Sequence, residues 1–316
     1  MNTASFNSKK NKVKTSKKIN ISTLQLVLLC IPGLLCFFIF NYIPMFGVIF
    51  AFKDYRYDLG LWKSEWVGMD NFKFFFSSND AFRVTRNTLL YNFTFIILVI
   101  AGSLFIAILL NEITKKKWIK LYQTIYFFPH FLSWPVVAFM TYALFQYDYG
   151  ILNQILEFFG LDPQLWYMTP KAWPIIMPLA NLWKTIGYNT ILFYAALIGI
   201  DTAYYEAAAI DGANRIKMAI HITIPLLKPV TIILLITKLG KIFYSDFGQF
   251  YMLPKNSGML YSVVDVIDTY VYRGLSVTGD IGMSSAVGLY QSIVGLIIVL
   301  TANYVIKKIS PDDAMF

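Results

Sequence analysis

Charged side chains are scarce in this sequence. Asp, Glu, Lys and Arg together make up 14% of its 316 residues, whereas 57% of the residues are hydrophobic. A typical soluble domain contains roughly 25% charged residues. The shortage of charge therefore excludes an ordinary soluble domain and indicates a membrane protein.

Residues with distinctive chemistry are also few. The only cysteines, Cys30 and Cys36, lie in one apolar stretch, where a disulfide framework is implausible. The only histidines are His130 and His221, and the sequence has no His-Glu-x-x-His motif or Cys/His cluster that would hold a metal. The only Gly-Lys pair, at 240–241, lacks the upstream glycine of a phosphate-binding loop. We therefore expect no catalytic residues, metal or cofactor in this chain.

The sequence does contain six long apolar stretches. They run over roughly Leu24–Phe52, Leu89–Leu110, Leu121–Phe145, Trp173–Ile200, Val230–Tyr251 and Met283–Ile306. A helix that spans a membrane needs about 20 mostly apolar residues, so we predict an all-α integral membrane protein with six transmembrane helices. The first stretch begins too deep and is too long for a cleaved signal peptide, and we expect it to remain as an anchor.

Basic residues gather between and beyond these stretches. Clusters lie at Lys9–Lys18, Lys115–Lys120, Arg215–Lys228 and Lys307–Lys308. Because loops that stay in the cytoplasm are enriched in Lys and Arg, we expect both termini to be cytoplasmic and the protein to lie in the cell membrane. The basic N-terminal tail fits lipid headgroups better than nucleic acid. We divide the chain into a tail (1–20), a transmembrane domain (21–309) and a second tail (310–316).

Three long loops should then face outward, at roughly Lys53–Thr88, Gln146–Ala172 and Met252–Gly282. They are rich in aromatic and turn residues. This composition is typical of short interfacial helices rather than of disorder. We expect these loops to offer a surface to a partner.

The cytoplasmic segment 201–229 contains the polar stretch Glu206–Pro229. Glu206 begins a run of helix formers, and Asp211-Gly212 should break that run because glycine accepts a positive φ. A second helix should follow, with one apolar face made of Ala213, Ile216, Ile220 and Ile224. The expected result is a rigid elbow suited to receive a push from a soluble partner.

This stretch resembles, position for position, the EAA loop of binding-protein-dependent ABC importer permeases. The matching residues are Glu206, Ala207, Ala208, Asp211, Gly212, Ala213, Ile222, Thr223 and Pro225; only the leucine often found before the proline is changed, to Ile224. Segments at Trp66–Phe76, Phe127–Ala138 and Tyr261–Leu275 look like the sugar-permease branch of this family, in its subgroup associated with complex oligosaccharides and polysaccharide fragments.

The resemblance implies a type I ABC importer permease fold and a set of partners. They are a paralogous second permease, two ATPase subunits that carry ATP and Mg, and an extracellular solute-binding protein that delivers an oligosaccharide. The elbow would be a coupling helix in a cleft of the ATPase. Glu206 would contact that subunit, Gly212 would form the turn, and Ala207 and Ala208 would allow close approach.

Polar and aromatic side chains in the apolar stretches are candidates for the substrate pathway, because polar groups at membrane depth tend to face a cavity or one another. Aromatic rings could stack on sugar faces while amides bond hydroxyl groups. The candidates are His130, Trp134, Asn181, Trp183, Lys184, Tyr188, Asn189, Lys238, Tyr244 and Gln291. Several have a structural alternative: the aromatics as interface anchors, His130 as a packing group, and Lys184 as half of a structural pair.

The lysines at membrane depth raise a question about cargo. Lys184, Lys238 and Lys241 face almost no acidic residues, since Asp246 is the only one in the six stretches. A negatively charged oligosaccharide is one hypothesis; the alternative is that backbone carbonyls, water or the partner permease satisfy the lysines.

Two other classes of protein remain as alternatives. An ion-coupled secondary sugar transporter would need an inverted repeat and acidic residues at the midplane, and the sequence has neither. A membrane enzyme would need a convergent cluster of His, Asp or Cys.

Overall fold

The computed structural model describes residues 21–309, so the predictions made for the two tails lie outside the described residues. The chain divides into two compact units, Met1–Gly47 and Val48–Phe316. The first unit holds α1 (Ile21–Phe37), η1 (Phe38–Tyr42) and the start of η2 (Ile43–Phe52). These elements form one helical path along the first predicted stretch.

Long apolar helices dominate the described chain. Three helical stretches are long and apolar enough to cross a membrane, namely Gln25–Phe52, α4 (Asn79–Asn111) and Ile281–Lys308 in α16 (Ile281–Ile309); counting two bent pairs as one span each raises this number to five. α8 (Trp173–Leu197) covers most of the fourth predicted stretch. Its polar residues, among them Lys184 and Asn189, make it less apolar than the other spans.

The third predicted stretch is broken rather than continuous. α5 (Lys116–Phe127) leads into the short η3 (Phe128–Phe131), and α6 (Trp134–Phe145) leaves at 101° to that path. Pro129 lies in η3 and Pro135 in the first turn of α6. Leu132 and Ser133, between the two prolines, have extended backbone, and Pro135 supplies no backbone N–H that could continue the ladder of hydrogen bonds across this break.

The fifth predicted stretch is also broken. α12 (Lys228–Leu239) ends twelve residues before the predicted boundary at Tyr251, and α13 (Phe247–Met252) begins only after a non-helical segment at 240–246. Asp246 caps α13, since its Oδ1 accepts a hydrogen bond from the backbone N–H of Gly248 (3.0 Å). A continuous helix over Val230–Tyr251 is therefore wrong.

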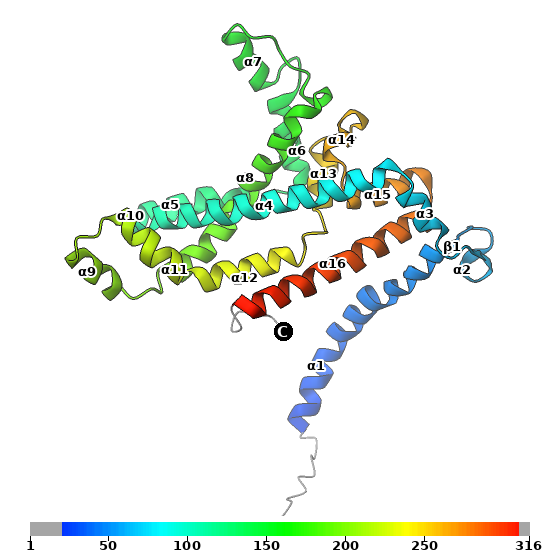
Figure 1. Cartoon of the computed structure of the whole chain (residues 1–316), viewed down its shortest axis with the longest axis horizontal. Coiled ribbons are helices and arrows are strands. Elements are labelled where there is room, and N and C mark those ends of the chain that lie inside the picture. Colours follow the sequence, from blue (N-terminus) through cyan, green and yellow to red (C-terminus); the bar gives the residue numbers. More distant parts are fainter. Residues whose placement is uncertain (1–20, 310–316) are drawn as a thin grey trace, which may run out of the picture. The chain divides into compact units, whose positions relative to one another are not determined.

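Helix pairing organises the second unit. α4 and α8 form its most extensive helix pair, α5 also lies against α8, and α12 contacts both α4 and α16. α6 contacts α13 on one side and carries α7 (Ile151–Phe158) beyond its end (Figure 1). Four separate sequence segments therefore meet where α4, α6, α8 and α13 approach one another.

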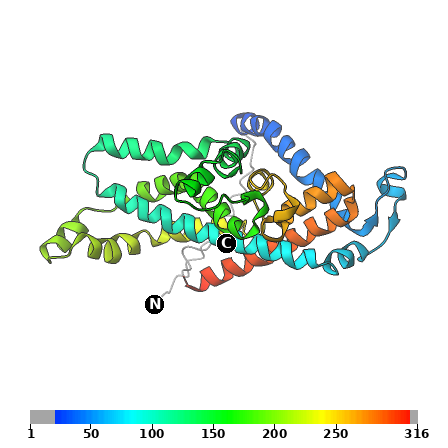
Figure 2. The same ribbon diagram turned by 90° about the horizontal axis from the view of Figure 1, so that it is seen from above.

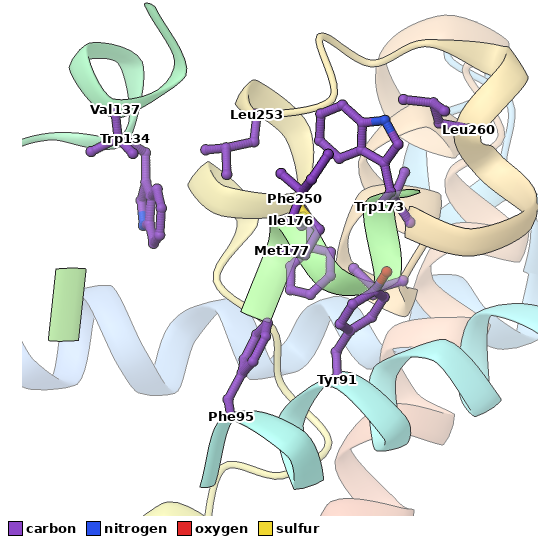
Figure 3. Packing of buried hydrophobic residues seen from close by; sticks show 12 residues of the cluster. Tyr91, Phe95, Trp134, Val137, Trp173, Ile176, Met177, Phe250, Leu253 and Leu260 are labelled. Atoms are coloured by element: carbon purple, nitrogen blue, oxygen red, sulfur yellow. The ribbon is translucent and has the colours of Figure 1, made fainter. Parts of the chain in front are cut away.

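The largest buried cluster fills that meeting point. Figure 3 shows Tyr91 and Phe95 of α4 pointing toward Phe250 of α13, with ring centroids 5.2 and 6.0 Å from that of Phe250. Trp173, at the start of α8, is fully buried in the same cluster. Burial of large aromatic side chains is a major source of packing energy, so this cluster fixes α13 against α4 and α8.

The loops predicted to be short helices are helical. The first loop contains α2 (Gly60–Lys63) and α3 (Asp70–Phe76), together with the paired strands β1 (Lys53–Asp54) and β2 (Glu65–Trp66). The second contains α7, η4 (Trp166–Met168) and η5 (Pro170–Ala172). The third contains η7 (Gly258–Leu260), α14 (Tyr261–Val264), α15 (Ile267–Arg273) and η8 (Gly274–Thr278).

A buried carboxylate ties the third loop to α4. The side chain of Asp265 is fully buried and pairs with Arg273 (2.5 Å) and Arg83 (3.4 Å), while Thr269 donates a hydrogen bond to it (2.8 Å). Asn87 of α4 also donates to the backbone oxygen of Asp265 (2.9 Å). Removing one partner of such a network leaves a buried charge uncompensated, so the loop is held firmly at this end of α4.

Candidate functional site

The predicted elbow is present. α9 (Ala203–Ile210) and α10 (Arg215–Met218) enclose a turn at Gly212, whose φ is +74°. A Cβ on Gly212 would meet nothing within 4 Å, so the requirement for glycine here is one of backbone conformation and not of space. Figures 1 and 2 show α9 and α10 projecting from one end of the second unit.

Two details of the elbow differ from the expectation. α9 begins at Ala203 and not at Glu206, because Asp201 accepts a hydrogen bond from the N–H of Ala203 (2.9 Å) and opens the helix earlier. Asn214 caps α10 by accepting from the N–H of Lys217 (2.8 Å), a role that sequence reasoning missed. The Asn at that point in the sequence is the usual signal for such a cap.

The elbow is anchored to the rest of the unit at two places. Tyr205 of α9 and Thr223, in η6 (Ala219–Thr223), share a hydrogen bond between their hydroxyl groups (2.9 Å). Arg215 pairs with Glu112 at the end of α4. η6 continues through α11 (Ile224–Leu226), which lies at 58° to α12. A force applied at the turn therefore has a continuous helical path to the broken fifth stretch.

The motif residues themselves leave much of the elbow open. Glu206, Ala207, Asp211 and Pro225 are exposed, whereas Ala208, Ala213 and Ile222 are partly buried. Three isoleucines also show most of their surface: Ile210 is 88%, Ile216 71% and Ile220 52% exposed. Contiguous exposed apolar surface beside polar groups is typical of a protein interface.

A second site forms where the two broken stretches meet. Lys184 of α8 donates hydrogen bonds to the backbone oxygens of His130 (3.1 Å) and Leu132, at the break between α5 and α6. Its ammonium also lies 5.3 Å from the ring centroid of Trp134. A helix end leaves carbonyl groups without partners, and the lysine satisfies two of them. Of the two hypotheses for Lys184, an acidic cargo or satisfaction by backbone carbonyls, the structure therefore shows the second.

Trp134 connects this lysine to the other break. Its indole N–H donates to Oδ2 of Asp246 (2.5 Å). A Cβ on Gly248 would lie only 2.6 Å from Cδ1 of the indole, so the tryptophan packs directly on α13. We call Lys184, Trp134, Asp246 and Gly248 the break junction. It places the first turns of α6 and α13 side by side.

Two other pathway candidates lie close to the break junction. His130 stacks on Tyr188, with ring centroids 5.0 Å apart, and on Phe127 at 5.6 Å. His130 is exposed and Tyr188 is 46% exposed. The stack is therefore partly exposed, with the His130 ring engaged by both Phe127 and Tyr188.

The amide candidates serve packing. Asn181 donates to Oε1 of Gln249 (2.8 Å), and Gln249, fully buried, donates to the backbone of Met177 (3.0 Å). Asn189 donates to the backbone of Thr185 in its own helix (2.9 Å), and Gln291 donates to the backbone of Phe243 (2.7 Å). The bonds of Asn181, Gln249 and Gln291 join separate segments and so help to fix them in place, whereas that of Asn189 stays within α8.

The last three candidates lie apart from the break junction. Trp183 is 41% exposed and lines an apolar cavity between α6 and α8. Tyr244 donates a hydrogen bond to Ser292 of α16 (3.2 Å). The side chain of Lys238 is partly buried in α12 and makes no hydrogen bond or ion pair with any described residue. Within residues 21–309 the charge of Lys238 therefore has no partner, in contrast to that of Lys184.

Sequence reasoning missed Asp268. This carboxylate, in α15, accepts hydrogen bonds from the N–H of Ser245 (2.8 Å) and from Gln291 (3.2 Å), so it joins the third loop to the break in the fifth stretch. Burial raises the pKa of Asp268, and the hydrogen bonds from Ser245 and Gln291 oppose that rise. Its position in a loop gave no sign that it would be buried.

The acidic and metal-binding side chains of the described residues are either dispersed or already engaged. Among residues 21–309 no group of three or more His, Cys, Asp or Glu residues is placed to hold a metal ion. Glu206 lies on the exposed elbow, and Asp246 is engaged by Trp134 and Gly248. What the arrangement offers is an exposed elbow joined by helices to a junction of broken spans.

Known proteins match this chain over nearly its full length. The sequence profile of the family described as "binding-protein-dependent transport system inner membrane component" matches residues 103–311. The protein LplB of Bacillus subtilis (strain 168) is 42% identical over 91% of this chain and 90% of its own. The polygalacturonan/rhamnogalacturonan transport system permease protein YteP of the same organism is 34% identical over 95% of this chain and 94% of its own.

Solved structures agree with the sequence matches. A chain of a bacterial ABC transporter involved in the import of the acidic polysaccharide alginate has a TM-score of 0.83 and 32% identity, over 92% of this chain and 97% of that one. A structure of a bacterial alginate ABC transporter in complex with an alginate pentasaccharide-bound periplasmic protein gives the same TM-score at 31% identity, over 92% and 96% of the two chains.

Proposed function

Because this chain belongs to the family of binding-protein-dependent transport system inner membrane components, we propose that it is one membrane-spanning subunit of an ATP-driven oligosaccharide importer. It pairs in the cell membrane with a paralogous permease and with two ATPase subunits that bind ATP and Mg. An extracellular solute-binding protein delivers the sugar. The alginate transporter crystallised with its periplasmic protein supports this last partner.

In this proposal the chain crosses the membrane six times, with both termini in the cytoplasm. The three uninterrupted spans, the two bent pairs and α8 together supply six crossings. The lysine clusters support a cytoplasmic location for the elbow and both tails. This topology leaves α7 and the third loop outside, where a solute-binding protein would dock.

The exposed elbow carries the proposal. Its motif residues lie beside three largely exposed isoleucines, and Gly212 supplies the left-handed turn. In the docked state Glu206 contacts the ATPase and the isoleucines lie in its cleft. Closure of the ATPase pair then moves α9 and α10, and η6, α11 and α12 carry the movement to the break junction.

The cargo we propose is an acidic oligosaccharide. Two observations support it: Lys238 has no partner among the described residues, and the names of two similar transporters refer to polygalacturonan and to the acidic polysaccharide alginate. The ammonium of Lys184 already binds two backbone oxygens, so it can bind the cargo only when the break junction opens during transport.

The experiment that tests this function compares elbow variants. Glu206→Lys reverses the exposed charge and Gly212→Trp places a bulky side chain where φ is positive, so each should abolish ATP-dependent uptake and co-purification of the ATPase. Lys217→Gln, which changes charge on the same elbow outside the motif, is the matched control. Normal uptake in both motif variants would refute the coupling role.

A further inference from the structure

A cavity outside the break junction has no role so far. It is a wedge of about 480 Å³ between α6 and the end of α13, lined by Pro135, Phe139 and Tyr142 on one side and by Tyr251 and Lys255 on the other. Small-molecule sites commonly occupy 300–1,000 Å³. The two helices touch at Trp134 and Gly248, and Pro135, the residue after Trp134, lines the wedge, so the wedge begins next to the break junction.

The open end carries a lysine over an aromatic ring. The ammonium of Lys255 lies 3.8 Å from the ring centroid of Tyr142. This ammonium donates no hydrogen bond and makes no ion pair within residues 21–309, and the described residues that line the wedge include no Asp or Glu. An aromatic face beside an unpaired cation suits a sugar ring that bears a carboxylate.

The turn that presents Lys255 is held in an unusual backbone conformation. Lys255 and Asn256 both have positive φ, at +55° and +48°. They are kept there by hydrogen bonds from the N–H groups of Lys255 and Asn256 to the oxygens of Met252 and Tyr251 (3.1 Å each), and by one from Tyr261 to Oδ1 of Asn256 (2.9 Å). Two adjacent residues other than glycine in this region are uncommon, and such clusters occur at binding sites.

Tyr142 and Lys255 also line a second cavity of about 270 Å³, which is bordered by Trp166 and Tyr167 and, unlike the wedge, contains a carboxylate, that of Asp148. The tyrosine therefore separates two spaces, each with an aromatic wall and both within reach of one ammonium. From Trp134 to Tyr142 helix α6 advances roughly 12 Å. More than one sugar ring is needed to fill this length.

We propose that this wedge is a receiving subsite for the acidic oligosaccharide, in which a uronate ring lies against Tyr142 and Tyr251 with its carboxylate on Lys255. The proposal rests on the function proposed above and adds where the cargo first contacts this chain. When the break junction opens, the chain end nearest Trp134 advances toward Lys184, and the next ring takes its place at Lys255.

The test measures access to the wedge directly. The full importer, with its partner subunits, carries Cys30→Ser, Cys36→Ser and Ala138→Cys, which places one thiol on the α6 wall. Trigalacturonate should slow its labelling by a water-soluble maleimide, whereas the methyl ester of trigalacturonate should do so far less. Adding Lys255→Gln should raise the half-protecting concentration of trigalacturonate about tenfold, the effect of one lost charge-assisted hydrogen bond.

Matched controls separate this site from its surroundings. Lys171→Gln removes an exposed lysine from another loop and should leave protection unchanged, and a thiol at Lys171→Cys should not be protected. No protection by trigalacturonate, or equal protection with and without Lys255, would overturn the subsite. Protection by the sugar-free solute-binding protein alone would also overturn it, because the wedge would then receive that protein.

Uptake measured on the same preparation distinguishes this inference from the proposed function. If ATP-dependent uptake of trigalacturonate occurs without protection of the thiol, the subsite is wrong and the importer stands. If the thiol is protected in a charge-dependent way but no oligosaccharide is imported, the subsite stands and the proposed function is wrong.

Discussion

Gly187, the only glycine of α8, should not tolerate a side chain. A Cβ at this position would lie 1.9 Å from the backbone oxygen of Tyr126 and 2.7 Å from the backbone nitrogen of Phe127, whereas ordinary contact begins at 3.4 Å. Both obstacles are backbone atoms, so no rotamer change relieves them. Gly187→Ala must therefore push the end of α5 away by about 1.5 Å or bend α8.

The expected cost follows from overpacking, at about 3 kcal/mol or more. At ~2–4 °C per kcal/mol for large domains, this lowers the Tm of the purified importer in detergent by roughly 6–12 °C. Uptake should fall as well, because the displaced end of α5 leads into His130, whose carbonyl binds Lys184.

Two alanine variants serve as controls for this prediction. A Cβ on Gly288 of α16 would meet nothing within 4 Å, so Gly288→Ala should leave Tm unchanged or raise it slightly. A Cβ on Gly102 would meet only the flexible end of Ile186, at 3.1 Å, and should have a small effect. Equal Tm values for Gly187→Ala and Gly288→Ala would refute the close crossing of α5 and α8.

Three further predictions concern the polar contacts. Trp134→Phe should lower the free energy of unfolding by about 1–2 kcal/mol, and with it Tm, because Asp246 loses its indole donor. An unchanged Tm would contradict a stabilising contact between Trp134 and Asp246. Lys238→Gln should reduce uptake of trigalacturonate but not of its methyl ester, whereas Lys184→Gln should reduce both; equal effects of Lys238→Gln on the two cargos would reject charge selection. Because the pKa of Asp268 is raised on folding, its ionisation opposes folding, and the stability of the protein should fall as pH rises from about 4 through that raised pKa. Asp268→Asn should remove this part of the pH dependence. A pH profile of Tm for the variant that is identical to that of the wild type would contradict the prediction.

The elbow was the most predictable part of the molecule. Gly212 and the helix formers before it are local signals, and the turn and both flanking helices depend on residues next to one another in sequence. The start of α9 was misplaced by three residues because Asp201, outside the motif, caps the helix.

The breaks were harder to predict. Hydropathy averages over a window and does not register a short non-helical segment inside an apolar run. Pro129 and Pro135 were visible in the third stretch, but prolines are also tolerated in continuous transmembrane helices. In the fifth stretch the break depends on Asp246, whose partner Trp134 lies 112 residues away in sequence.

Contacts between distant segments decided which polar residues were available. The charge of Lys184 is balanced by carbonyl groups that are free to accept its hydrogen bonds only because the third stretch is broken. Asp268 is buried only because α15 packs against the end of α16. Neither contact has a local signal. The chemical type of each candidate could therefore be predicted, while its partner could not.

The central claim is that ATP hydrolysis by a separate subunit, received at the elbow, drives import through this chain. The most direct measurement is uptake of trigalacturonate into proteoliposomes that contain the co-purified importer and its solute-binding protein. ATP is supplied in the compartment that the ATPase subunits face, and no ion gradient is imposed. The account predicts uptake that requires ATP and the solute-binding protein and that Glu206→Lys abolishes. Uptake that proceeds without ATP when an ion gradient is imposed would contradict it.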